Sequence, residues 1–148
     1  MIEKIVGLLL SDLKQIEDTR GAVLHMIRNN SLGFIDFGEC YMSEINPHQI
    51  KAWKRHSKQT QNITVPIGRI RFVAYDDRSE SPTYKTIAEY ELGRPDSYKR
   101  ITIPPGVCYG FKSITNVSTL IVNCTDLPYS KDESLQIDIN ENNIPYSW

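Results

Sequence analysis

The stretch Gly68-Arg69-Ile70-Arg71-Phe72-Val73 decides the fold class, because apolar and charged residues alternate along it. In an extended chain Ile70 and Phe72 fall on one face and the two arginines fall on the other. The stretch therefore predicts a β-strand that has one face in a core and the other in water.

Segments of similar character lie on both sides of this strand. They are rich in Val, Ile, Thr, Tyr and Phe, and Pro, Gly, Asn or Asp separates them about every ten residues. This spacing is typical of an all-β sandwich or barrel. The best strand candidates are residues 40–45, 50–55, 63–66, 70–75, 85–92, 98–103 and 120–124.

The two ends of the chain are less regular. Residues 2–16 carry apolar side chains at positions 5, 6, 9, 10 and 13, so an amphipathic helix and a strand fit equally well, although Gly7 weakens the helix. Residues 130–143 are acidic and polar, which predicts a loop or a short helical turn. The aromatic residues of the terminal 144–148 need a surface to pack against.

Length and charge limit the possible functions. The 148 residues suit one domain, 1–148, and 17 basic against 18 acidic side chains argue against a nucleic-acid partner. The apolar run 5–10 has six residues, far fewer than the ~20 of a membrane helix, and no cleavage site follows it. Three cysteines without CxxC spacing predict free thiols. We expect a cytoplasmic protein without a membrane partner.

Two further stretches are Lys54-Arg55-His56 with Gln61 and Gly68, and residues 104–109, which read Pro-Pro-Gly-Val-Cys-Tyr. They resemble the two halves of a cupin signature, which places three His and one carboxylate around a metal inside a β-barrel. Lys54, Gln61 and Tyr109 stand where three ligands would be, and these side chains are poor ligands for transition metals. We therefore expect no metal and no cofactor.

Six motifs follow one another along the chain: Asp18-Thr19-Arg20-Gly21, Trp53-Lys54-Arg55-His56, Tyr75-Asp76-Asp77-Arg78 with Ser81-Pro82-Thr83, Ile103-Pro104-Pro105-Gly106 with Gly110-Phe111, Cys124-Thr125-Asp126 and the terminal Trp148. Their order resembles one cupin group, the dTDP-4-dehydrorhamnose 3,5-epimerase family, over nearly the whole chain. This resemblance favours strand over helix for residues 2–16. We expect Asp76, Asp77 and Arg78 to form a structural turn with an ion pair.

The resemblance implies a fold, a partner and a substrate. The fold would be a single-domain cupin jelly roll, and the chain would form a homodimer in which the N-terminal strands of residues 1–36 are exchanged or packed with the partner. The substrate would be a nucleotide-diphospho-4-keto-6-deoxy sugar, used for surface polysaccharide, whose C3 and C5 protons the ketone acidifies. His56 falls on the family's catalytic base, and an imidazole with an ordinary pKa of ~6.5 suits that role.

Other positions depart from the family pattern. The enolate-stabilising Lys falls on Gln61, the acid Tyr falls on Val122, and the Arg before the His is Trp53. We therefore assign Tyr109 as the replacement acid. Gln61 and Asn62 would hydrogen-bond an enolate oxygen. Arg20 would contact the diphosphate, with Lys54 and Arg69 as further substrate-binding candidates.

The departures leave two classes of function open. One is an enzyme that removes and returns a proton, as a 3,5-epimerase, a single epimerase or a 3,4-ketoisomerase. The other is a cupin that binds a sugar nucleotide or carbohydrate without turnover. A structural role stays open for His56 and Tyr109, and His25 and His48 are interpreted as non-catalytic.

Overall fold

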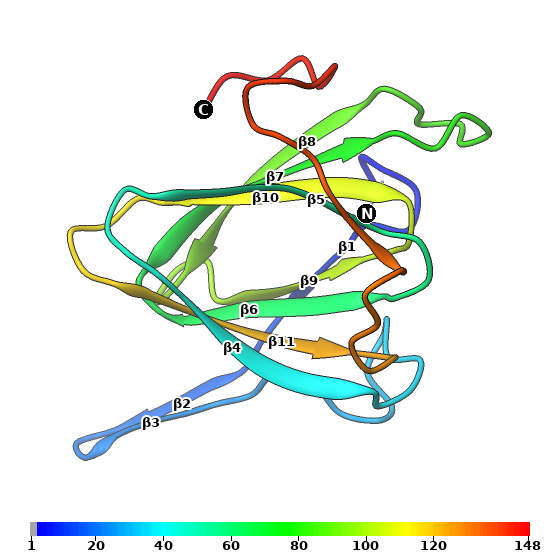
Figure 1. Cartoon of the computed structure of the whole chain (residues 1–148). Helices are drawn as coiled ribbons and strands as arrows, with labels where there is room; N and C mark the ends of the chain where they lie inside the picture. The colour runs from blue at the N-terminus through cyan, green and yellow to red at the C-terminus, as the bar shows by residue number, and fades with distance from the viewer. Residues whose placement is uncertain (1–2) are drawn as a thin grey trace.

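The computed structural model describes residues 3–148 as two five-stranded antiparallel sheets packed face to face, with a separate two-stranded hairpin (Figure 1). One sheet has the strand order β1-β9-β6-β11-β4 and the other has the order β12-β5-β10-β7-β8. The strands are β1 (Leu9–Asp12), β2 (Gln15–Asp18), β3 (Gly21–Leu24), β4 (Glu39–Ile45), β5 (Ile50–His56), β6 (Gln61–Ile67), β7 (Arg69–Asp76), β8 (Ile87–Gly93), β9 (Lys99–Ile103), β10 (Val107–Ser113), β11 (Thr119–Thr125) and β12 (Ser134–Gln136).

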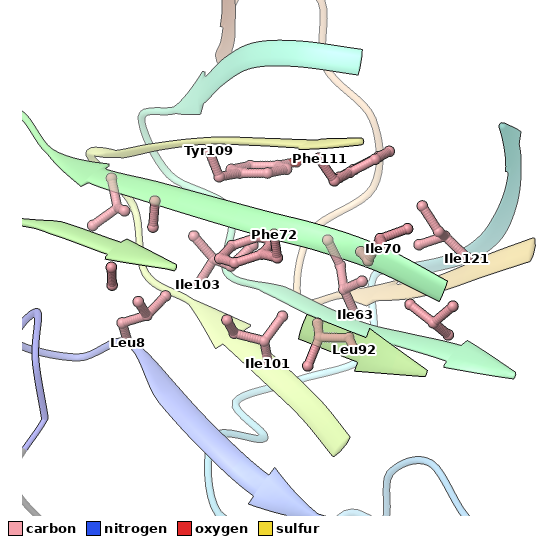
Figure 2. Close-up of a cluster of buried hydrophobic side chains, with 14 of the residues drawn as sticks. Leu8, Ile63, Ile70, Phe72, Leu92, Ile101, Ile103, Tyr109, Phe111 and Ile121 are labelled. Atoms are coloured by element: carbon pink, nitrogen blue, oxygen red, sulfur yellow. The ribbon is translucent and has the colours of Figure 1, made fainter. Parts of the chain in front are cut away.

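This arrangement confirms the predicted all-β jelly roll and the seven predicted strands. It follows from the alternation along β7, where Ile70 and Phe72 are fully buried. Arg69 and Arg71 lie on the opposite face and pair with Glu91 and Glu89 of β8. Figure 2 shows the core between the sheets, to which β7, β9, β10 and β6 each contribute side chains.

Strand β10 was missing from the predicted strands. It lies between β5 and β7, and six of its seven residues are buried, so its sequence does not alternate between apolar and polar residues. Position 110 of this strand must be a glycine for a steric reason, because a Cβ there would come within 2.4 Å of the Ala52 Cβ. A central strand covered on both faces lacks the alternation by which exposed strands are detected.

The prediction for residues 130–143 was wrong at one point. Ser134–Gln136 form the edge strand β12, which pairs with β5 at Lys54, Arg55 and His56. The segment is polar because it lies at a sheet edge, and its strand conformation comes from this pairing rather than from its own side chains. The pairing brings the residue before β12, Glu133, beside the end of β5.

The two ends of the chain have different environments. The strand interpretation of residues 2–16 is correct for residues 9–12 and 15–16 and wrong for residues 3–8, which are in no strand. Residue 2 lies outside the described residues. The hairpin β2–β3 projects from the body (Figure 1) and is joined to it by Arg94, which donates to Gln15 and Glu17. At the other end Trp148 packs on the buried Trp53, with ring centroids 5.1 Å apart.

The turn after β7 contains the predicted ion pair between Asp76 and Arg78, whereas Asp77 pairs with Arg55 of β5 at 2.6 Å. Asp76 is fully buried and accepts hydrogen bonds from Arg78 Nε at 2.8 Å, Ser81 Oγ at 2.7 Å and Thr83 Oγ1 at 2.6 Å. Burial alone would raise the pKa of Asp76, but these hydrogen bonds outweigh it and hold that pKa well below its usual value. Asp76 is therefore a structural carboxylate.

Predictions from the sequence also concerned the state of the cysteines and membrane-spanning helices. The three cysteines are free thiols, as predicted. Within residues 3–148 there is no helix that could cross a membrane.

Candidate active site

A cavity of about 470 Å³ lies between the two sheets, within the size range of small-molecule sites. One side, which we name the β5–β10 wall, comes from β5, β10 and β12; the other, the β4–β11 wall, comes from β4, β6 and β11. The β5–β10 wall includes Lys51, Trp53, Lys54, Tyr109, Phe111 and Gln136, and the β4–β11 wall includes Tyr41, Ser43, Ile63, Ile121 and Asn123. Figure 2 shows Tyr109 and Phe111 on one sheet and Ile63 and Ile121 on the other.

The last residue of β5, His56, is held by a buried carboxylate. His56 is 5% exposed, and its Nδ1 contacts Oε1 of Glu133. The second oxygen, Oε2, accepts hydrogen bonds from the backbone N–H groups of Lys58 at 3.1 Å and Gln59 at 2.9 Å. Both carboxylate oxygens are therefore occupied, and the orientation of the imidazole is determined.

The ionised state of Glu133 determines which nitrogen of His56 carries the hydrogen. Burial by itself would raise the pKa of Glu133, but the hydrogen bonds from His56, Gln59 and Lys58 keep that pKa below its usual value. A carboxylate can only accept, so Nδ1 carries the hydrogen and Nε2 has the free lone pair. Burial lowers the pKa of His56, although Glu133 opposes this shift. The imidazole is thus neutral at pH 7 and can act as a base at Nε2.

Tyr109 lies next to that basic nitrogen, on the same wall. Its hydroxyl is 3.4 Å from His56 Nε2, and its ring stacks between His56 and Phe72. Burial raises the pKa of Tyr109 strongly, so the phenol keeps its proton. The structure thus brings His56 and Tyr109 together as neighbours, with both groups on one side of the cavity.

Lysine side chains add positive charge to the cavity. Lys54 precedes His56 by two residues on β5, and among residues 3–148 no salt bridge involves it. Lys51 donates to Ser43 Oγ at 2.9 Å and to the Glu44 carbonyl at 2.7 Å, which ties the two walls together. The Lys54 ammonium is therefore available to an anionic group in the cavity.

The β4–β11 wall carries a tyrosine that sequence reasoning missed. Tyr41 on β4 lies opposite Asn123 in the register of β4 with β11, and its hydroxyl accepts a hydrogen bond from Asn123 Nδ2 at 2.9 Å. Burial raises the pKa of Tyr41, so this phenol is also protonated at neutral pH. No local motif marked Tyr41, because 82 residues separate it from its partner.

Glu133 was missed as well. It lies in the segment predicted as a loop, and its carboxylate acts on His56, which is 77 residues away. An acidic residue in an acidic, polar segment carries no distinguishing sequence signal. Only the pairing of β12 with β5 shows that it is the partner of His56.

The side chains of Gln61 and Asn62, which were predicted to contact the enolate, do not line the cavity. Gln61 is fully buried and hydrogen-bonds to Gln59 and Asn123. Asn62 accepts from Thr102 Oγ1 at 2.7 Å and donates to the Gly33 carbonyl at 3.3 Å. Neither side chain lines the cavity, and their polar groups are bound within the protein.

The two predicted phosphate-binding arginines also lie outside this cavity. Arg69 is on the outer face of its sheet, where it pairs with Glu91 and Asp96, each at 2.8 Å. Arg20 lies at the turn of the β2–β3 hairpin, with its side chain 88% exposed and paired with Asp18. Within one chain the structure therefore brings together His56, Tyr109 and Lys54 from the predicted set, and not Arg20, Arg69, Gln61 or Asn62.

The two remaining histidines lie away from the cavity. His48 is exposed and hydrogen-bonds to Asn116 Oδ1 at 2.8 Å, which confirms a surface residue. His25 is half-buried, with Nδ1 at 3.3 Å from the Arg28 guanidinium. His56 is thus the one histidine among residues 3–148 that adjoins the cavity-lining side chains.

Known proteins resemble this chain in sequence and in fold. A solved structure described as a dTDP sugar isomerase, from Desulfovibrio desulfuricans G20, superimposes with a TM-score of 0.96 at 45% identity, covering 100% of this chain and 94% of that one. The probable low-salt glycan biosynthesis epimerase Agl13 of Haloferax volcanii is 32% identical over 91% of this chain and 84% of its own length. The spore coat polysaccharide biosynthesis protein SpsL of Bacillus subtilis is 27% identical over 97% of this chain and 96% of its own length.

The family model for dTDP-4-dehydrorhamnose 3,5-epimerase matches residues 3–148. Together with the relatives it indicates a sugar-nucleotide epimerase or isomerase of glycan biosynthesis. The chain belongs to the dTDP-4-dehydrorhamnose 3,5-epimerase family.

Proposed function

We propose that this protein removes and returns a proton next to the ketone of a nucleotide-diphospho-4-keto-6-deoxy sugar, with His56 as the base. The observation that carries the proposal is the His56–Glu133 pair. The buried carboxylate holds Nδ1–H, so Nε2 is left as a neutral basic nitrogen beside a cavity of sugar-binding size.

The reaction balances without a redox partner. The C–H bond at C3 or C5 breaks, its proton moves to His56 Nε2, and its electron pair moves through the C–C bond to the ketone oxygen. The resulting enolate is anionic, and the ammonium of Lys54, which forms no salt bridge within residues 3–148, lies in the same cavity to stabilise it. Return of a proton to the carbon restores the ketone.

Tyr109 acts on the face from which His56 takes the proton. The hydroxyl is 3.4 Å from Nε2, longer than the roughly 3.2 Å limit for direct proton transfer, and such contacts tighten when substrate binds. In the complex the two groups would then exchange a proton. This pair by itself supports removal and return of a proton on one face of the sugar.

The substrate's diphosphate requires a cation of its own, because Lys54 is assigned to the enolate, and we propose that a second copy of the chain supplies Arg20. The β2–β3 hairpin pairs with itself and exposes Ile16 at 48% and Val23 at 61%. A homodimer in which the hairpin packs on the partner would cover these apolar side chains and carry Arg20 toward the partner's cavity. A guanidinium suits bidentate binding of phosphate oxygens.

The relatives support a place in glycan synthesis. The names of two of them refer to spore coat polysaccharide and to low-salt glycan biosynthesis. We propose that this protein, too, supplies a sugar for a surface polysaccharide. The competing function is a cupin that binds the sugar nucleotide without turnover, which the replacement of the family's Lys and Tyr by Gln61 and Val122 favours.

Proton NMR in deuterated buffer tests the proposal. Purified protein is mixed with dTDP-4-keto-6-deoxyglucose, and the signals of the C3 and C5 protons are followed. We expect loss of at least one signal with the wild type and a rate at least ~10²-fold lower with His56→Ala, the size of effect typical of a general base.

His48→Ala is the matched control, because it removes an exposed histidine and should exchange at the wild-type rate. Binding of the sugar nucleotide without loss of either signal would favour the binding protein. Exchange that survives in His56→Ala would show that another group is the base.

A further inference from the structure

A chain of side-chain amides ends at the hydroxyl of Tyr41. Gln59 Nε2 donates to the backbone carbonyls of Leu127 at 2.9 Å and Pro128 at 3.0 Å. Gln61 Nε2 donates to Gln59 Oε1 at 2.9 Å, and Asn123 Nδ2 donates to Gln61 Oε1 at 2.6 Å. The same Nδ2 donates to the Tyr41 hydroxyl at 2.9 Å. We name Gln59, Gln61 and Asn123 the amide relay.

Backbone groups determine the direction of this relay. The carbonyls of Leu127 and Pro128 can only accept, so Gln59 must present its NH₂ to them and its oxygen to Gln61. At the other end the backbone N–H of Asn62 can only donate, and it donates to Asn123 Oδ1 at 3.2 Å. Asn123 must therefore turn its NH₂ toward Tyr41.

This polarity decides where the Tyr41 proton points. The phenolic oxygen accepts from Asn123, and among residues 3–148 no hydrogen bond donated by Tyr41 is present. The O–H hydrogen is left for the cavity that Tyr41 lines. Burial raises the pKa of this phenol, so the proton is retained until a stronger base takes it.

Tyr41 lies on the opposite wall from His56 and its neighbours. It comes from β4, at the edge of one sheet, whereas His56 and Tyr109 come from β5 and β10 in the other sheet. A sugar ring between the walls would present one face to Tyr109 and His56 and its other face to Tyr41.

From this geometry we infer that Tyr41 donates a proton to the enolate on the face opposite His56, and that the amide relay aims its hydroxyl. The inference rests on the proposed function and deepens it, because it makes the reaction an inversion. The enolate carbon takes the Tyr41 proton as the ketone re-forms. The phenolate then regains a proton from water, which reaches it because Tyr41 is 38% exposed. The imidazolium of His56 releases the proton that it took from the sugar to water, so both groups return to their starting states. Gln61, at the position of the family's Lys, acts in this scheme as a positioning residue.

The test separates removal of a proton from inversion. In deuterated buffer the rate of deuterium entry at C3 or C5 reports His56, and the amount of inverted sugar, resolved by the proton coupling constants, reports the second donor. With Tyr41→Phe we expect deuterium entry within a few-fold of wild type and inversion at least ~10²-fold slower. Tyr84→Phe, an exposed tyrosine outside the cavity, is the matched control and should leave both rates unchanged.

A second variant tests the relay without removing the phenol. In Asn123→Asp the isosteric carboxylate accepts where the amide donated, so the Tyr41 proton turns away from the cavity. We expect inversion to fall about 10-fold while deuterium entry stays within a few-fold, which corresponds to loss of one oriented hydrogen bond.

Each outcome decides a different claim. Inversion at the wild-type rate in Tyr41→Phe would overturn the role of Tyr41 while the proposed function stands. A wild type that exchanges deuterium but never inverts the sugar would do the same. A wild type without any exchange would overturn the proposed function and this inference together.

Discussion

The two walls of the cavity differ in how the chain brings their functional residues together. On the β5–β10 wall, Lys54 and His56 are two residues apart on one strand, and Tyr109 pairs with Lys54 on the next strand. On the β4–β11 wall, Tyr41 acquires its orientation from Asn123, its neighbour across two strands that are far apart in sequence. Short sequence motifs can therefore identify functional residues that lie close together on one strand. They cannot identify residues that become neighbours only through the pairing of distant strands.

The largest expected effect on the rate of deuterium entry comes from Glu133, which orients His56 beside the β5–β10 wall. Glu133→Gln removes the charge that holds His56 Nδ1–H, so the productive tautomer is no longer favoured. We expect deuterium entry to slow by about 10³-fold, between the effects of a lost orienting partner and of a wrong tautomer. The NMR exchange assay measures this rate.

The pH profile of the same variant excludes a merely structural effect. His56 must be neutral to act, and burial lowers its pKa below the ordinary ~6.5, so wild-type kcat/KM should stay level above this pH and fall as pH drops through the lowered pKa. Without Glu133, which opposes the lowering, the fall should move to still lower pH. Glu91→Gln is the control on the outer face. An unchanged profile and rate would contradict the assigned role of Glu133.

A smaller effect is expected from the cavity cation. Lys54→Met keeps the length of the side chain and removes its charge, so the enolate loses one electrostatic partner. We expect kcat to fall about 10²-fold, which is typical for loss of one group that stabilises a developing oxyanion. The control is Lys58→Met, an exposed lysine of the same basic run. Equal kcat in the two variants would show that Lys54 does not contact the enolate.

The smallest expected effect compares the two tyrosines directly. Tyr109→Phe keeps the buried ring and removes the hydroxyl 3.4 Å from His56 Nε2. We expect deuterium entry to slow about 10-fold while the ratio of inversion to entry stays constant, because Tyr109 is on the wall of the base. Tyr41→Phe should instead change that ratio. If Tyr109→Phe abolishes inversion alone, the assignments of the two walls are reversed.

Much of the fold was predictable from local pattern. Alternation in 68–73 and the regular turn residues predicted seven strands, and the motif around His56 predicted the base candidate. The largely buried β10 and the polar edge strand β12 did not show alternation, because neither has one apolar and one wet face. Gln61 and Asn62 were assigned to the cavity by position in a motif, yet internal hydrogen bonds hold their side chains.

The sequence by itself determined the all-β class, the family and the strand that carries Lys54 and His56. These properties depend on residues that are near one another in the chain, where alternation and motif spacing act. The tertiary structure alone decided that Glu133 orients His56 and that Asn123 orients Tyr41. Both contacts depend on strand register, which sets the neighbours of a side chain across the sheet regardless of their separation in sequence.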